Sequence, residues 1–140
     1  MSDLKQKVQE RLSGADVWAL ATVTDDGKPW VRYVTPRADK DMTVWCATFA
    51  GSRKVPQIAH NPEVHLVVGV RDAASAQAWL QIQGRAVVLS DTASRKAVWN
   101  DELSHVFSGP DDPNLTVIKI TQYRIEYQIM APVPPDVLEL

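Results

Sequence analysis

Apolar and polar positions alternate along much of this 140-residue chain with the period of two that is typical of half-buried β-strands. The segments with this alternation, or with a short run of strand-forming residues, are 17–23, 30–34, 42–48, 63–70, 78–89, 116–120 and 124–129. Turn residues separate neighbouring segments, and Asp25-Asp26-Gly27-Lys28 predicts a β-hairpin. The pattern therefore predicts a sheet built mainly from hairpins.

Helical periodicity is limited to three short stretches. Apolar residues recur at every fourth position in residues 3–12, which predicts an amphipathic helix closed by a Ser-Gly pair. A second helix is expected to begin between Arg53 and Val55, because Pro56 is tolerated only in a first helical turn. A third is expected over residues 91–99, opened by an Asp or Thr cap.

Strands outnumber helices in this pattern, and no strand–helix–strand alternation is visible. We therefore expect an α+β fold, a six- to seven-stranded antiparallel barrel with flanking helices at its rim. The length predicts a single domain over residues 1–140. Residues 132–140 are proline-rich and are expected to run over the surface or against a partner.

Composition is that of an ordinary globular domain, with 45% hydrophobic and 23% charged residues. Apolar runs fall well short of the ~20 residues of a membrane span, and the first residues lack a signal peptide's apolar core. We therefore expect a cytoplasmic protein without a membrane partner. A net charge of −2 lacks the basic excess typical of nucleic-acid binding. The single cysteine, Cys46, excludes an internal disulfide and is predicted to be a core residue.

Common catalytic signatures are absent from the sequence. It has no GxGxxG after a strand and no GxxxxGK[ST], so neither a dinucleotide-binding fold nor a P-loop is indicated. It has no GxSxG motif for acyl transfer. The three histidines, His60, His65 and His105, are scattered and form no spaced cluster with Asp or Glu, so no metal site is predicted.

Positive charge is concentrated locally in residues 32–56, which contain Arg32, Arg37, Arg53 and Lys54. A turn of small residues leads from an apolar strand into the expected second helix. Backbone N–H groups would then face the same point as Ser52, Arg53 and Lys54, an arrangement suited to a phosphate. A Ser-Arg-Lys tripeptide by itself is more commonly solvated surface. The tripeptide alone leaves both interpretations open.

Two further side chains are conspicuous for the strand face on which they lie. Arg32 shares a face with Trp30 and Val34, which fits either an edge arginine that reaches back to water or an anion ligand. Trp79 lies among glutamines, on the face opposite Leu80. A large aromatic residue on a polar strand face indicates an interface or a pocket wall.

The order and spacing of several segments resemble the FMN-binding split-barrel family, which includes pyridoxamine 5'-phosphate oxidase and the general stress protein 26 group. The segments that carry the resemblance are RYVTPR (32–37), ATFAGSRK (47–54), QIAHNP (57–62), IQGRA (82–86) and GPDDP (109–113). The resemblance covers nearly the whole chain. It implies a split barrel that forms a homodimer with FMN at the subunit interface.

The resemblance also assigns roles to individual residues. The cofactor-binding residues that it implies are Arg32, Tyr33, Val34, Thr35, Arg37, Ala47, Thr48, Ser52, Arg53, Lys54 and Trp79. Residues 32–37 would form the strand that faces the flavin ring. Thr48, Ser52, Arg53 and Lys54, together called the phosphate cradle below, would hold the phosphate. Trp79 would come from the second subunit.

Three positions depart from the family pattern. Arg37 stands where the oxidase typically has lysine, Trp79 where it has glutamine, and Gln128 where the stress-protein pattern commonly has tryptophan. The sequence also lacks the arginine-rich C-terminal extension that closes the oxidase's substrate site. Oxidation of vitamin B6 is therefore not expected, and the environment of the ring is less defined than the phosphate site.

The resemblance implies a flavin-dependent oxidoreductase or flavin reductase of the general stress protein type. Its partners would be a nicotinamide donor or another small-molecule substrate, and the flavin would do the chemistry without a protein acid or base. One alternative is a flavin-binding or flavin-buffering protein without turnover. Another is a split barrel that uses a different cofactor, such as deazaflavin F420 or haem, or that binds none. FAD is the alternative to FMN as the flavin.

Overall fold

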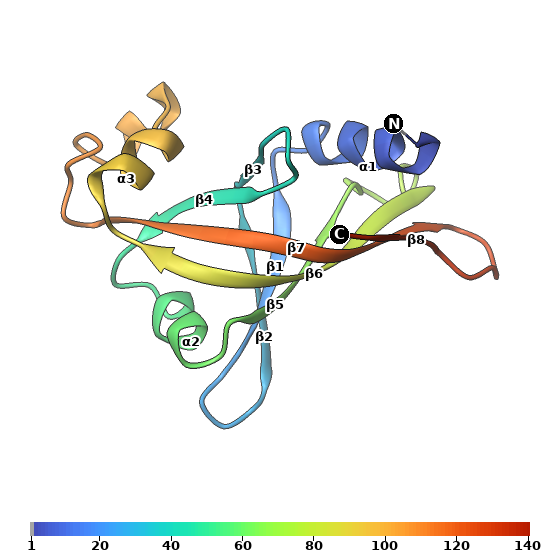
Figure 1. Cartoon of the computed structure of the whole chain (residues 1–140), viewed down its shortest axis with the longest axis horizontal. Helices are drawn as coiled ribbons and strands as arrows, with labels where there is room; N and C mark the ends of the chain where they lie inside the picture. Colours follow the sequence, from blue (N-terminus) through green and yellow to red (C-terminus); the bar gives the residue numbers. More distant parts are fainter. Residues whose placement is uncertain (1) are drawn as a thin grey trace.

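One antiparallel sheet dominates the computed structural model, which describes residues 2–140 (Figure 1). The strands are β1 (Trp18–Val23), β2 (Pro29–Val34), β3 (Arg37–Ala38), β4 (Val44–Phe49), β5 (Glu63–Val68), β6 (Ala78–Leu89), β7 (Leu115–Ile129) and β8 (Asp136–Glu139). The helices are α1 (Asp3–Ser13), α2 (Lys54–His60), α3 (Thr92–Val98) and the 3-10 helix η1 (Asp101–His105). The sheet order is β2-β1-β5-β6-β7-β4-β3, with β8 paired to β7. The predicted α+β antiparallel fold is confirmed.

Strand β7 corrects the sequence prediction, which divided it into two strands over residues 116–120 and 124–129. It runs unbroken for 15 residues. The polar residues in its middle coincide with a register shift in the β6–β7 pair, between Gln83 and Gly84. There the buried Gln122 donates from Nε2 to the backbone oxygen of Met42. The interruption of the hydrophobic pattern therefore marks a β-bulge within one strand and not the end of a strand.

The proline-rich tail is the second correction. Residues 132–140 were expected to run over the surface or a partner, but β8 joins the sheet beside β7. Its Glu139 lies opposite Arg124 and forms an ion pair with it. The continuous strand order contains seven strands, within the predicted number, and β8 adds an eighth beside β7.

Local capping residues set the ends of the first and third helices. Ser2 accepts a hydrogen bond from the backbone N–H of Lys5 at the start of α1, and Gly14 follows its last residue. Asp91 accepts from the backbone N–H of Ser94 at the start of α3, which confirms the predicted cap. No helix within residues 2–140 has the length and apolar character needed to span a bilayer.

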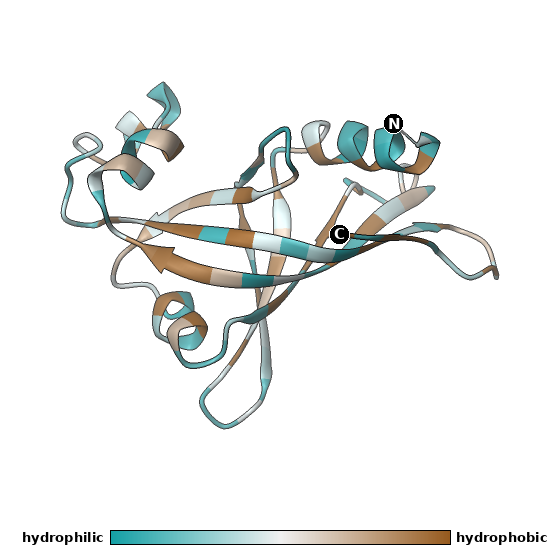
Figure 2. Cartoon of the chain, in the orientation of Figure 1, coloured by the Kyte–Doolittle hydropathy of each residue, from teal (hydrophilic) through white to brown (hydrophobic). Residues whose placement is uncertain are grey.

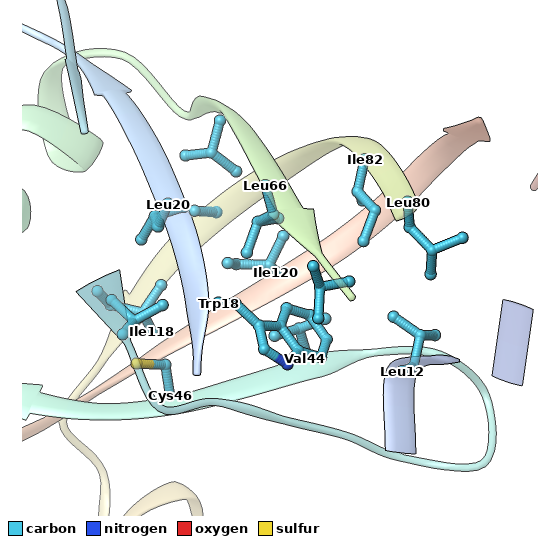
Figure 3. Packing of buried hydrophobic residues seen from close by; sticks show 14 of the residues in the cluster. Leu12, Trp18, Leu20, Val44, Cys46, Leu66, Leu80, Ile82, Ile118 and Ile120 are labelled. Atoms are coloured by element: carbon cyan, nitrogen blue, oxygen red, sulfur yellow. The ribbon is translucent and has the colours of Figure 1, made fainter. Parts of the chain in front are cut away.

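The core lies inside the curl of the sheet, where alternate side chains of the strands meet. Figure 2 shows hydrophobic and hydrophilic residues alternating along β7. The core residues labelled in Figure 3 are Leu12, Trp18, Leu20, Val44, Cys46, Leu66, Leu80, Ile82, Ile118 and Ile120. Leu12 comes from α1, which closes one part of the barrel. The predicted burial of Cys46 is confirmed.

Candidate anion site at the start of helix α2

Backbone hydrogen bonds fix the turn between β4 and α2. The N–H of Ala50 donates to Asn114 O at 2.8 Å, and the N–H of Ser52 donates to Phe49 O at 3.0 Å. Helix α2 begins at Lys54, within the predicted range. The N–H groups of Arg53 and Lys54 donate to no acceptor within residues 2–140. Because α2 has only seven residues, the side chains contribute more to any anion site than the helix dipole does.

Side chains of the phosphate cradle converge on this turn. Thr48 is buried at the end of β4, and its Oγ1 lies 3.5 Å from the Ser52 Oγ. Lys54 is half-buried. The Arg53 guanidinium lies over the ring of Trp30, with its carbon 5.1 Å from the ring centroid. The β1–β2 hairpin therefore contacts the cradle through Trp30.

Arg32 points inward and connects this hairpin to α2. Its Nη1 donates to Thr22 Oγ1 at 2.7 Å, to Trp30 O at 3.2 Å and to Leu20 O at 3.3 Å. Its Nη2 donates to Gln57 Oε1 at 3.0 Å. The sequence left two interpretations of Arg32 open. These bonds exclude the interpretation in which Arg32 is an edge arginine whose side chain reaches back to water. Arg32 contributes its charge to the site while its two terminal nitrogens hold the fold together.

The electrostatics of the site show uncompensated positive charge. Burial lowers the pKa of Arg32, and the nearby Arg53 lowers it further. Burial is also the main cause of the lowered pKa of Lys54; the Cys46 thiol opposes the shift and Arg32 adds to it. Within residues 2–140, none of these three cations forms an ion pair with a carboxylate. A bound anion would favour their charged forms and relieve their repulsion.

A second copy of the same tripeptide shows how much the surroundings matter. Ser94-Arg95-Lys96 lies inside α3, where Asp91 accepts hydrogen bonds from both the N–H and the Oγ of Ser94. Arg95 donates from Nη1 to Asp112 O. Backbone hydrogen bonds from Ser108 and Asn114 are the main causes of the lowered pKa of the Asp112 carboxyl, and the charge of Arg95 adds to them. Carboxylates therefore accompany the α3 tripeptide. The cradle's tripeptide has cations as its charged neighbours.

The remaining predicted residues, apart from Trp79, differ in their exposure. Val34 is buried in the core, and Ala47 is partly buried in β4. Thr35 is exposed, and its backbone N–H faces the Cys46 thiol. Tyr33 is 82% exposed on the outer face of the sheet. Arg37 is exposed in β3, opposite Trp45.

Trp79 is remote from the cradle within one protomer. It is the second residue of β6, whereas the cradle lies beside the last residues of that strand. There Leu89 pairs with Val117, next to Thr116, which pairs with Thr48. With a rise of about 3.3 Å per residue, the 12 residues of β6 span roughly 40 Å. The structure does not bring Trp79 and the cradle together in a single chain.

Sequence reasoning missed Trp30, which packs against Arg53 of the cradle, and it missed Thr22 and Gln57, which hold Arg32. Two signals were present. Gln57 follows Arg53 by four residues and therefore lies on the same side of α2. Thr22 pairs with Trp30 across the hairpin, next to Arg32 on β2. Both signals depend on knowing the hairpin register and the side of α2 that faces it.

Comparison with known proteins places the chain in a family. Residues 4–129 match the sequence profile of the family described as "Pyridoxamine 5'-phosphate oxidase". The chain belongs to the pyridoxamine 5'-phosphate oxidase family. It is also 33% identical over 138 residues to General stress protein 26 of Bacillus subtilis (strain 168), with 99% of this chain and 97% of that protein covered. The resemblance to the general stress protein 26 group is thereby confirmed.

Solved structures agree with this assignment. The crystal structure of the General Stress Protein 26 from Bacillus anthracis str. Sterne superposes with a TM-score of 0.83 at 29% identity, covering 99% of this chain and 100% of that one. The family's split-barrel fold, predicted from sequence, is therefore confirmed. A heme binding protein from Mycobacterium smegmatis has the same fold, with a TM-score of 0.77 at 17% identity, covering 99% of this chain and 59% of that one.

Proposed function

We propose that this family member binds FMN through the phosphate cradle and acts as a flavin-dependent oxidoreductase or flavin reductase. The observation that carries the proposal is the group of cations without carboxylate partners at the start of α2. Arg53 and Lys54 make no hydrogen bond through their side chains to any acceptor within residues 2–140, so their donors are free for phosphate oxygens.

The cradle offers donors of the kinds that a phosphate monoester uses. The Arg53 guanidinium is supported by Trp30, and the Lys54 ammonium stands on the first turn of α2. The hydroxyls of Thr48 and Ser52 and the free N–H groups of the turn add neutral donors. Such a donor set matches a terminal phosphate better than the uncharged end of riboflavin.

The outer face of the sheet supports a homodimer. Strand pairing forms one row across β2, β1 and β5 from Tyr33, Ala19 and Val67. The next outward-facing pair along β1 and β2 is Ala21 and Val31. Tyr33 is 82%, Val31 64% and Val67 40% exposed. An apolar row across three strands is typical of a surface that a partner covers. We propose that a second copy covers it.

A homodimer would also account for Trp79. Its side chain lies on the same outer face, because Val67 pairs with Gln81, two residues along β6 from Trp79. One protomer holds Trp79 far from its own cradle, so the proposed role of Trp79 in flavin binding requires the partner's copy. Residues 32–37 would line the ring from the protomer that holds the phosphate.

Bound FMN would supply hydride or electron transfer at its ring. The protein would bind the phosphate, orient the cofactor and place the charge of Arg32 close to it, which favours a reduced, more negative ring. A flavin-binding protein without turnover is separated from a reductase by a steady-state assay with NADH or NADPH. The proposed activity requires turnover in that assay.

The first experiment is a visible absorption spectrum of the purified protein. Flavin bands are expected, and they differ from those of haem, which the fold of the Mycobacterium smegmatis protein makes the main rival. FMN, FAD and F420 are then distinguished by chromatography of the released cofactor. A haem spectrum, or a deazaflavin in place of a flavin, would overturn the proposal.

The second experiment removes the charges of the cradle. Replacing Arg53 and Lys54 together by alanine should weaken FMN binding at least about 100-fold, because charge-assisted hydrogen bonds contribute about 1.5–3 kcal/mol each. Fluorescence titration with FMN measures the change. Riboflavin should bind the unmodified protein much more weakly than FMN does and should be less affected by the substitutions.

The second Ser-Arg-Lys tripeptide provides the matched control. Lys96→Ala removes an exposed lysine from the same sequence context in α3 and should leave FMN affinity unchanged. It is compared with Lys54→Ala, which should weaken binding. Unchanged affinity in a folded Arg53→Ala/Lys54→Ala double variant would contradict the assignment of the cradle.

A further inference from the structure

A hollow of about 900 Å³ lies beneath helix α1 and shares no residue with the phosphate cradle. Its walls come from α1, the entry to β1, the loop between β5 and β6, Tyr33 of β2 and Tyr127 of β7. Its volume falls within the range of about 300–1,000 Å³ that is typical of small-molecule sites. Of the residues that line it, only Tyr33 also belongs to the proposed function, which places Tyr33 on the dimer face and on the strand beside the flavin ring.

Arg11 is held in place at the wall of this hollow. Its Nη1 donates to the backbone oxygens of Ala78 at 3.0 Å and Gly69 at 3.4 Å. One face of its guanidinium packs over the ring of Tyr127, with a carbon-to-centroid distance of 5.7 Å. Nε and Nη2 donate to no acceptor within residues 2–140. The free edge is therefore the pair of parallel N–H donors that binds a carboxylate in two-point fashion.

The charges of the lining favour an anion with a single charge. Lys7, Arg11 and Arg71 are opposed by Glu10 and Asp16, which leaves one net positive charge. None of these five residues forms an ion pair within residues 2–140. A monoanion is matched to this balance, whereas a second negative charge on the ligand would be repelled by the two carboxylates.

The rest of the lining suits a planar ring. Tyr33 and Tyr127 contribute aromatic surface, and Val17 and Val70 contribute aliphatic surface. Lys7 lies over the Tyr127 ring, with its Nζ 5.9 Å from the centroid, so two of the three cations of α1 lie beside an aromatic wall. A flat apolar body with one charged end is the shape and charge that these walls complement.

We propose that this hollow binds a planar aromatic monocarboxylate, with its carboxylate on the free edge of Arg11 and its ring against the tyrosines. The site rests on α1, the β5–β6 loop and β7, and it does not require flavin in the cradle. Bound ligand and bound flavin would occupy separate places on each chain.

Isothermal titration calorimetry of the full chain with 2-naphthoate tests the proposal. One molecule is expected to bind per chain. The uncharged 2-naphthamide and the dianionic 2-naphthyl phosphate should each bind at least about tenfold more weakly, since one lacks the charge that Arg11 recognises and the other exceeds it. Equal affinity for the acid and the amide would overturn the proposal.

Variants locate the site. Arg11→Lys keeps the positive charge but removes the pair of parallel N–H donors. Arg71→Ala removes an exposed cation. Each substitution should weaken 2-naphthoate binding about tenfold. Arg71 lies in a surface loop, so its variant is expected to fold even if the Arg11 variant does not. The matched control is Arg85→Ala, an arginine that also lies over a tyrosine ring but outside the hollow.

The cradle variant separates this proposal from the proposed function. Arg53→Ala/Lys54→Ala should bind 2-naphthoate with unchanged affinity, whether or not the protein binds FMN. Saturating FMN should likewise leave the naphthoate affinity of the unmodified protein unchanged. Loss of naphthoate binding in the cradle variant, or competition with FMN, would overturn the assignment of a separate site.

Discussion

Arg32 joins three parts of the molecule at the scale of a single residue. Its terminal nitrogens reach the backbone of β1 and β2, the hydroxyl of Thr22 and the side-chain oxygen of Gln57 on α2. The same side chain adds positive charge beside Arg53 and Lys54. Its structural role and its electrostatic role can be separated by substitution, because lysine keeps the charge but not the set of bonds.

Arg32→Lys is expected to lower the free energy of unfolding by about 1–3 kcal/mol, because Thr22 and Gln57 lose their guanidinium partner. Urea denaturation measures the difference. Arg37→Lys is the control: Arg37 is exposed and makes no side-chain hydrogen bond within residues 2–140, so its substitution should change stability by less than about 0.5 kcal/mol. Equal effects of the two changes would contradict the role of Arg32.

Cys46 is expected to be chemically inert in the folded protein. Burial raises the pKa of its thiol to about 11, although Lys54 and the Thr35 N–H pull in the other direction. The thiolate is the reactive form, and little of it exists at pH 8. A thiol-reactive disulfide reagent should therefore leave Cys46 unmodified at pH 8 until denaturant is added. Rapid labelling of the native protein would show that the β4 end of the core opens readily.

The arrangement of elements was largely predictable from the sequence where the hydrophobic pattern was regular. The β1–β2 hairpin, the start of α2 and the Asp91 cap follow from local signals. Prediction failed where a tertiary contact decided the outcome. The polar residues in the middle of β7 predict a boundary between two strands. The sequence pattern does not reveal that Gln122 lies at a bulge and bonds to Met42 in the core. Residues 132–140 are predicted to form a loop because they are rich in proline. In the structure these prolines precede β8 and leave it free to pair.

The candidate site was predictable only in part for a similar reason. Ser52, Arg53 and Lys54 are contiguous, so their convergence follows from one turn and one helix start. Trp79 lies at the opposite end of β6 from the cradle, and no local pattern could place it beside its predicted ligand. Ser94-Arg95-Lys96 has the same amino-acid sequence as the cradle's tripeptide, but carboxylates lie close to it.

Gly84 tests the packing of the long β6–β7 pair. A Cβ atom at this position would lie 2.7 Å from Ile120 Cγ2 and 3.1 Å from Thr121 O, beside the bulge. Gly84→Ala is therefore expected to destabilise the protein by about 1–3 kcal/mol through overpacking. Gly109→Ala is the control, because a Cβ there meets no atom within 4 Å. Thermal unfolding of both variants measures the difference; a neutral Gly84→Ala would mean that the bulge adjusts freely.

At the scale of the whole molecule, the proposed dimer surface and the proposed flavin site depend on each other. The outer face carries the exposed apolar row, and Trp79 lies on that face at the end remote from its own cradle. Association of two copies would cover the row and supply each cradle with the other chain's Trp79. Flavin affinity should therefore depend on protein concentration near the dimer dissociation constant.

Val67→Glu places a charge in the middle of this face and should convert the dimer to a monomer with weakened FMN binding, because a buried unpaired carboxylate is costly. Light scattering at micromolar concentration, with FMN titration, measures both effects. Val106→Glu introduces the same change at an exposed valine next to η1 and should affect neither. A monomer that retains flavin would refute the coupling.

The pairing of β4 with β7 also dictates when the cradle can exist during synthesis. β4 bears Thr48 and leads into Arg53 and Lys54, yet its long neighbour is β7, whose first residue follows the end of β4 by more than sixty positions. A ribosome-bound chain that has not yet exposed β7 leaves β4 with only the two-residue β3 beside it. Contacts between such distant segments form late, after a large loss of chain entropy. An anion at this site would therefore bind only nearly completed chains and leave shorter nascent ones unliganded.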